Sequence, residues 1–190
     1  MAFTVVYDAC VLYPAPLRDL LMRLAVARFV RARWTETILD ECFRNIVASK
    51  PELDPSALVR TRQLMNSAIP DCLVTGYEPL IAALDLPDPD DRHVLAAAIR
   101  CAAQVIVTAN LRDFPPKQLE PYDLEAQHPD HFVLGIIDLA PGAVASIVVQ
   151  QAAALKNPPS SVAELLDTLR RQGLVRSVAK LRELLGVIGE

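Results

Sequence analysis

Three aspartates at the start of an otherwise apolar segment have the clearest chemical potential in this sequence: Asp88, Asp90 and Asp91. Asp88 is placed to cap a helix that begins at Pro89 and continues through an alanine-rich run. At about 100° per residue, Asp91 falls in the middle of the apolar stripe of this helix and Asp88 falls within its width, whereas His93 points away. Two carboxylates therefore face the buried side, where an unpaired charge costs on the order of several kcal/mol.

Two interpretations of this segment remain open at this point. In the first, Asp88 caps the helix and Asp91 complements the helix dipole, with a cap worth ~0.5–2 kcal/mol. In the second, the carboxylates converge on Mg²⁺ or Mn²⁺, because both ions prefer oxygen ligands. The other polar residues of the chain have to decide between a structural cap and a metal site.

Two strands are expected to bring further polar residues to the same place. Residues 3–7 are apolar and β-branched, which predicts a buried strand that ends at Asp8. Residues 104–108 predict a second buried strand, followed by Asn110 and Asp113. A helix that leads directly into a strand is half of a βαβ unit, so we expect a parallel sheet. If the two strands are neighbours in this sheet, Asp8 and Asn110 meet at one edge, where the helix near Asp88 also begins.

Helical periodicity accounts for most of the remaining chain. We expect helices over residues 14–29, 36–48, 55–67, 76–84 and 129–139, a short strand at 72–75, and an edge strand within 122–127. On the second of these helices Glu41 lies nearly opposite the apolar face, which alone indicates a surface charge. Further helices at 141–155, 161–171 and after Gly173 form a predicted C-terminal extension. We therefore predict two domains, residues 1–139 and 140–190.

Composition restricts the class of protein. The chain has 190 residues, of which 52% are hydrophobic, and a mean hydropathy of +0.26, which argues against disorder and predicts one substantial core. No apolar run is long enough to span a bilayer, and the first seven residues lack the basic start of a signal peptide. We therefore expect a soluble cytoplasmic protein that does not enter a membrane.

Cysteine and charge patterns exclude some functions and leave others open. The four cysteines form no CxxC pair and are expected to be buried, reduced thiols: Cys10, Cys42, Cys72 and Cys101. A net charge of −4 argues against a broad basic nucleic-acid surface, but not against a nuclease whose metal ions supply positive charge. Five arginines scatter around the first helical segment, mostly as solvated charges, with phosphate contact as the alternative: Arg18, Arg23, Arg28, Arg31 and Arg33.

The order of these features resembles the PIN domain family, and within it the VapC-type toxins of bacterial toxin–antitoxin pairs. The blocks that carry the resemblance are residues 5–8, 35–41, 88–98 and 107–114, with a weaker match at 128–132. It implies an α/β/α sandwich with a central parallel sheet, and a Mg²⁺- or Mn²⁺-dependent ribonuclease. By position it implies catalytic roles for a set of acidic and amide residues, and metal contacts from Asp8, Asp88 and Asp91. That catalytic set is Asp8, Glu41, Asp91, Asn110 and Asp113.

The resemblance also implies partners. These are an RNA substrate and a cognate antitoxin that inserts a basic side chain into the acidic edge. Apart from the resemblance, the apolar helices lead us to expect a dimer. The sequence departs from the family at Cys10, where an Asn or Ser is usual, and at the neutral Asn110. These departures leave a PIN-fold scaffold that binds RNA or protein as the alternative.

Other acidic folds fit less well. A phosphatase of the haloacid-dehalogenase type needs a second Asp two residues after the first, at the position of Cys10. An EF-hand needs a central Gly and a closing Glu, and a receiver domain needs a Lys after a late strand. None of these patterns is present.

Overall fold

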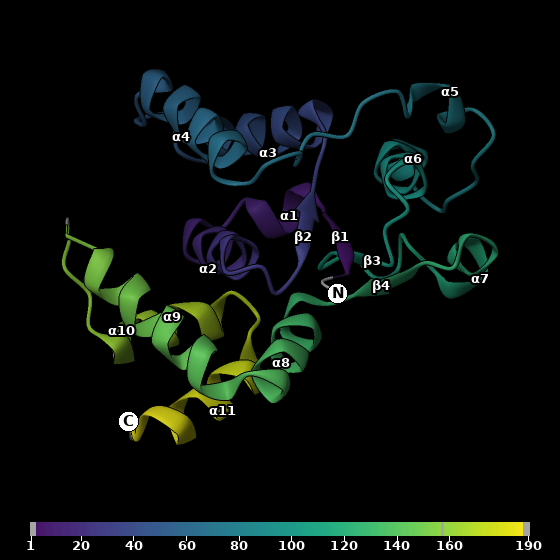
Figure 1. The fold of residues 1–190 in the computed structure, drawn as a ribbon. Helices are drawn as coiled ribbons and strands as arrows, with labels where there is room; N and C mark the ends of the chain where they lie inside the picture. Colours follow the sequence, from purple (N-terminus) through teal and green to yellow (C-terminus); the bar gives the residue numbers. More distant parts are fainter. Residues whose placement is uncertain (1–2, 157, 188–190) are drawn as a thin grey trace.

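Four parallel strands form the central sheet in the computed structural model, which describes residues 3–156 and 158–187 (Figure 1). Across the sheet the strand order is β2-β1-β3-β4. Their bounds are β1 (Thr4–Tyr7), β2 (Arg31–Arg33), β3 (Val105–Val107) and β4 (Glu125–Gln127). Thus β1 and β3 are neighbours, which is the condition under which Asp8 and Asn110 were expected to meet.

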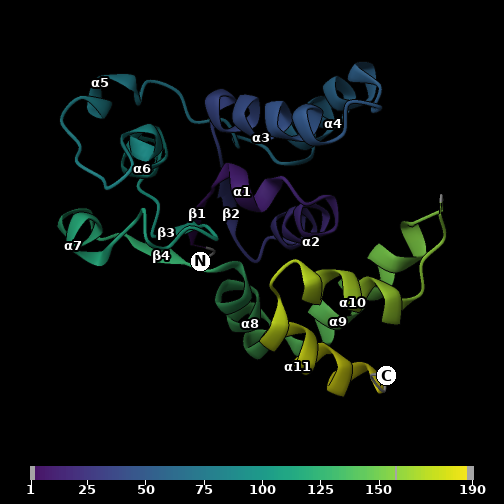
Figure 2. The ribbon, with the colours of Figure 1, turned by 180° about the vertical axis from the view of Figure 1, so that it is seen from behind.

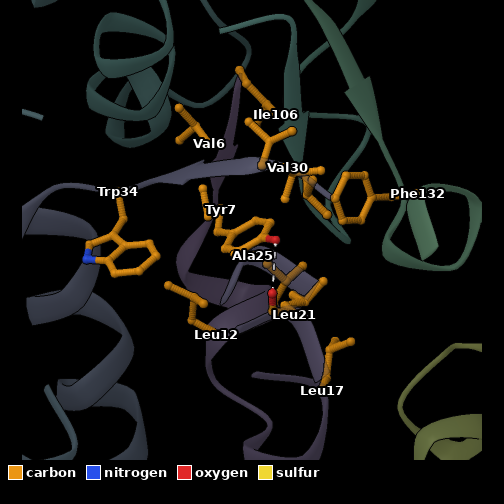
Figure 3. Close-up of a cluster of buried hydrophobic side chains, with 14 of the residues drawn as sticks. Val6, Tyr7, Leu12, Leu17, Leu21, Ala25, Val30, Trp34, Ile106 and Phe132 are labelled. Atoms are coloured by element: carbon orange, nitrogen blue, oxygen red, sulfur yellow. Dashed lines mark hydrogen bonds between the residues drawn. The ribbon is translucent and has the colours of Figure 1, made fainter. Parts of the chain in front are cut away.

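Helices cover both faces of this sheet. Successive side chains of a strand point to opposite faces, so Val6 and Tyr7 in β1 contact different layers (Figure 3). The Val6 face is covered by α6 (Arg92–Arg100), which contacts β1 and β3. The Tyr7 face is covered by α2 (Ala15–Val26) and α8 (Pro129–Leu139). The predicted α/β/α sandwich is confirmed.

Aromatic side chains pack around the buried ring of Tyr7. The Tyr7 ring stacks on Trp34 with a centroid separation of 6.5 Å, and it meets the edge of Phe132 at 6.1 Å. Its hydroxyl donates to the carbonyl of Leu21 at 3.3 Å, so the polar end of this fully buried residue is paired (Figure 3). Fully burying such a ring contributes roughly 2–3 kcal/mol.

The remaining helices surround this core. They are α1 (Ala9–Leu12), α3 (Glu36–Ser49), α4 (Pro55–Ala68), α5 (Glu78–Ile81), α7 (Pro116–Leu119), α9 (Pro141–Ala154), α10 (Val162–Arg171) and α11 (Val175–Leu185). Short 3₁₀ turns are η1 (Pro89–Asp91) and η2 (Glu120–Tyr122). Among the helices described, none alone has the length and apolarity to span a membrane, and α8 with α9 passes that test as a pair only with a 120° bend.

The C-terminal helices gather on one side of the molecule and pack on α2 (Figures 1 and 2). Gln151 in α9 donates to the carbonyl of Pro16 at 2.8 Å, and Gln172 accepts from the amide of Leu17 at 3.1 Å. The capping box predicted for Ser161 and Glu164 is present at the start of α10. The C-terminal helices are thus hydrogen-bonded to the first α-helical layer, while the predicted domain boundary at residue 139 stays a prediction.

The structure differs from the sequence-based expectation at several boundaries. The helix expected to reach residue 29 ends at Val26, and the chain then enters β2, which was not predicted. The strand was missed because only one of its three residues, Ala32, is apolar. The segment at 72–75 forms a single parallel bridge, Trp34 to Leu73, rather than a strand. The predicted helix at 76–84 is the single turn of α5, and α6 begins at Arg92 because η1 precedes it.

Asp130 connects the first and last C-terminal helices. Its carboxylate accepts from the amides of Ser177 (2.8 Å) and Arg176 (2.9 Å), in the first turn of α11. Burial raises the pKa of Asp130, but these hydrogen bonds outweigh it, so the pKa lies below its usual value. The residue is therefore a helix cap supplied from a different helix.

We expect Asp130→Asn to lower the free energy of unfolding by about 1–3 kcal/mol, because the amide group presents a donor where the first turn of α11 needs an acceptor. The measurement is urea unfolding at neutral pH. The matched control is Asp138→Asn, on the exposed side of the same helix, which should change stability by less than about 0.5 kcal/mol. Equal effects in the two variants would contradict a capping role.

Candidate active site

Asp8 lies at the carboxyl end of the central strand β1 and is almost completely buried, with 4% of its surface exposed. It caps the short helix α1, accepting from the amide of Ala9 at 2.6 Å. Its second oxygen accepts from the hydroxyl of Thr108 at 2.7 Å and from the thiol of Cys10 at 3.0 Å. Burial raises the pKa of Asp8, these hydrogen bonds lower it, and the charge of Glu41 raises it again; the net shift is upward.

Thr108 joins the ends of β1 and β3. It is fully buried, and besides donating to Asp8 it accepts from the amide of Asn110 at 3.0 Å. Cys10 supports the same junction, because its sulfur accepts from the amide of Ala109 at 3.2 Å. Asp8 and the backbone of Asn110 thus share one hydrogen-bonding partner at the edge of the sheet, where the strand order was expected to bring them.

Thr108 was not selected from the sequence. The available signal was a hydroxyl side chain at the end of an apolar strand, directly before the polar pair around Asn110. Cys10 was treated as a departure from the family pattern, whereas in the structure its thiol donates a hydrogen bond to the carboxylate of Asp8. Burial and the neighbouring charge of Asp8 raise the pKa of the Cys10 thiol to about 12, so this thiol is a neutral donor.

Asp91 is the residue whose titration is most affected by other carboxylates. Its pKa is raised to about 7, first by partial burial and then by the charges of a surrounding set. That set is Asp8, Asp88, Asp113 and Glu41. Residues far apart in the sequence are therefore close enough here to repel one another. The predicted acidic residues lie in a single negative region at one edge of the sheet.

The capping interpretation accounts for Asp88 but not for Asp91. The Asp88 side chain accepts from the amide of Asp90 at 2.9 Å and begins η1. The Asp91 side chain makes no capping hydrogen bond at the start of α6. Asp91 is thus a half-buried carboxylate whose surroundings disfavour its charge, a pattern that occurs often at functional sites.

Glu41 approaches this region from α3. Its side chain is one-third exposed, and its carboxylate lies 3.6 Å from Nε2 of His93, the second residue of α6. The helical wheel alone indicated a surface charge for Glu41 and a direction away from the apolar stripe for His93. In the structure these two polar faces meet, and Glu41 is close enough to raise the pKa of both Asp8 and Asp91.

The donor chemistry fits a hard divalent cation. The clustered side chains carry carboxylate oxygens, and a cation would relieve the repulsion that raises the pKa of Asp91. In the parts of the chain that the structure describes, however, no three Asp, Glu, His or Cys side chains converge tightly enough to form a metal-ligand group. The residues therefore suit the ion by type and charge, without a preformed coordination shell.

Comparisons with known proteins cover both parts of the chain. A family model described as "PIN domain" matches residues 4–112, and one described as "VapC50 C-terminal domain" matches residues 129–183. A curated protein of Mycobacterium tuberculosis (strain ATCC 25618 / H37Rv), "Putative ribonuclease VapC50", is 42% identical over 123 residues. This alignment covers 63% of the present chain and 72% of that protein. No solved structure matches the chain significantly.

The raised pKa of Asp91 predicts that stability falls as pH rises. Between the ordinary value of 3.8 and about 7 the folded protein binds more protons at Asp91 than the unfolded chain, so the stabilisation present below pH 3.8 is lost as pH passes 7. We expect Asp91→Asn to be more stable than the wild type at pH 8 by roughly 1–2 kcal/mol, allowing for solvent screening, and equally stable near pH 4. Urea unfolding in EDTA measures both. A variant that is less stable at pH 8 would contradict the repulsion.

Thr108→Val should lower the free energy of unfolding by about 1–3 kcal/mol, because it leaves buried Asp8 without one donor and the amide of Asn110 without its acceptor. Thr108→Ser keeps the hydroxyl and should recover most of this loss. Thermal and urea unfolding compare the three proteins. If the Ser and Val variants lose the same stability, packing rather than the hydrogen bonds explains the effect.

Proposed function

The chain belongs to the PIN domain family, and from this premise we propose that it is a divalent-metal-dependent endoribonuclease, the toxin of a type II toxin–antitoxin pair. The observation that carries the proposal is the half-buried Asp91 among four other carboxylates, at the edge where strands β1 and β3 end. Its similarity to a protein named as a ribonuclease supports RNA as the substrate class.

Asp8 and Asp91 are the residues we assign to hold Mg²⁺ or Mn²⁺, with Asp88 or Glu41 completing the shell directly or through water. When bound, the ion supplies a water of lowered pKa for in-line attack on a phosphodiester and neutralises charge that develops on the phosphate. The Thr108 and Cys10 hydrogen bonds hold the Asp8 carboxylate in one orientation before any ion arrives. Such preorganisation is what a metal ligand requires.

Two residues on the loop after β3 are assigned to orient water and the backbone. Asn110 carries an uncharged amide that donates and accepts, and Asp113 adds a carboxylate whose charge reaches Asp91. The amide of Asp113 donates to the carbonyl of Asn110 at 3.0 Å, so both lie in one tight turn. This turn follows the strand that Thr108 ties to Asp8, which keeps its position coupled to the proposed metal ligands.

The antitoxin follows from the family assignment. An antitoxin that places an Arg or Lys at the acidic edge would relieve the repulsion between the carboxylates, as a metal ion would. It would therefore compete with the metal. A dimer is proposed separately, from the apolar helices of the chain. A small neighbouring reading frame with a DNA-binding pattern would support the antitoxin.

The second candidate is a PIN-fold scaffold that binds RNA or protein without cleaving it. It is favoured by the absence, within residues 3–156 and 158–187, of three converging metal-ligating side chains. Calorimetric titration with Mn²⁺ separates the two functions. Neither heat of binding nor cleavage of any RNA would support the scaffold.

We expect Asp8→Asn to reduce Mn²⁺-dependent RNA cleavage roughly a hundredfold or more, because the amide removes a negatively charged ligand from the proposed site. The fold should persist, since an amide oxygen can still accept from Ala9. The measurement is cleavage of a labelled RNA pool, with circular dichroism to verify folding.

Asp123→Asn is the matched control, because this exposed residue lies in a turn before β4 and has a left-handed backbone that Asn tolerates. It should cleave like the wild type. Retained cleavage in Asp8→Asn would remove the central assignment.

A further inference from the structure

A cavity of about 530 Å³ lies against β2, the edge strand of the sheet. Arg31, the first residue of β2, pairs with Thr4 at the start of β1, whereas Asp8 follows the end of that strand. The walls of the cavity come from Ala25 in α2, from residues 28 and 30–33, and from the turn at 69–71 after α4. None of the proposed metal ligands lines this cavity, so the two sites are separate.

Three arginines line this cavity: Arg28, Arg31 and Arg33. In the described parts of the chain, none of their guanidinium groups forms a salt bridge or a side-chain hydrogen bond, and Asp71 is the single acidic residue in the lining. Nε of Arg33 is in addition buried without a hydrogen-bonding partner. A buried donor without a partner is costly, so Arg33 has hydrogen-bonding capacity that the described residues leave unused.

The backbone at Arg28 supports the same conclusion. The amides of Phe29 and Arg28 donate to the carbonyls of Leu24 and Ala25, which ends α2 in a Schellman motif. The residue at the left-handed position of that motif is usually glycine, but here it is Arg28, with a φ of 63°. An arginine that occupies a position suited to glycine and lines a basic cavity points to a use for its side chain.

We propose that this cavity binds the phosphate group of a nucleotide. Arginine presents its donors in a planar fork that matches phosphate oxygens in a bidentate manner. The volume lies within the range of small-molecule sites, about 300–1,000 Å³. The apolar surfaces of Ile69 and Pro70 stand beside the arginines and offer contact for a sugar or base. The proposal does not depend on the ribonuclease assignment.

The test is isothermal titration of the full chain with inorganic phosphate, with AMP and with adenosine. We expect saturable binding of phosphate, tighter binding of AMP, and none of adenosine. Arg31→Gln and Arg33→Gln should each weaken AMP binding roughly tenfold. Arg60→Gln, an exposed arginine on α4 outside the cavity, is the matched control and should bind like the wild type.

Arg28→Gly separates a binding role from a structural one. Glycine suits the left-handed backbone, so this variant should keep or raise the Tm while it weakens AMP binding. Asp8→Asn should bind AMP normally, so failure of the ribonuclease proposal would leave this result unaffected.

Three outcomes would overturn the nucleotide site. These are absence of saturable AMP binding by the wild type, equal affinity of the wild type and the Arg31→Gln and Arg33→Gln variants, and competition by short RNA without competition by AMP.

Discussion

Burial of a carboxylate at the end of the central strand is the constraint on which the acidic edge depends. Asp8 follows three fully buried residues of β1 and is itself nearly inaccessible, so solvent cannot stabilise its charge. Donors from Ala9, Thr108 and Cys10 substitute for water. Two of them come from helix α1, which follows β1, and one from the residue that follows the neighbouring strand β3. The packing of β1 against β3 is therefore also what makes the charge of Asp8 tolerable.

The parallel sheet explains why distant acidic residues collect at this edge. Strands that run the same way end at the same side, and a helix that leads into such a strand begins there. Asp8 and Asp113 follow strands, while Asp88 and Asp91 precede the helix that leads into β3. Glu41 arrives separately, because α3 turns its polar face toward His93. The resulting repulsion between carboxylates raises the free energy of the folded protein, and a bound cation would relieve it.

Sequence reasoning located the elements with strong local patterns. The strands β1 and β3 are short apolar runs, and the capping box at Ser161 specifies the start of α10, so these were predictable. The strand β2 was not predictable, because two of its three residues are arginines and the segment lacks an apolar run. Glu41 came from the family resemblance and not from the helical wheel, which describes a helix without its neighbours. Thr108 required knowledge of strand pairing, since its partner Asp8 is 100 residues away.

Net charge is a poor guide to the ligands of this protein, because the fold gathers carboxylates in one place and arginines in another. The overall value of −4 combines carboxylates at the carboxyl ends of β1 and β3 with arginines in and just before the edge strand β2. The carboxylates collect at one end of the sheet because residues that follow parallel strands meet there, whereas the arginines line a cavity beside the edge strand β2. The carboxylates and the arginines therefore form two distinct charged surfaces. A chain with a negative net charge can in this way carry both a site for cations and a site for phosphate.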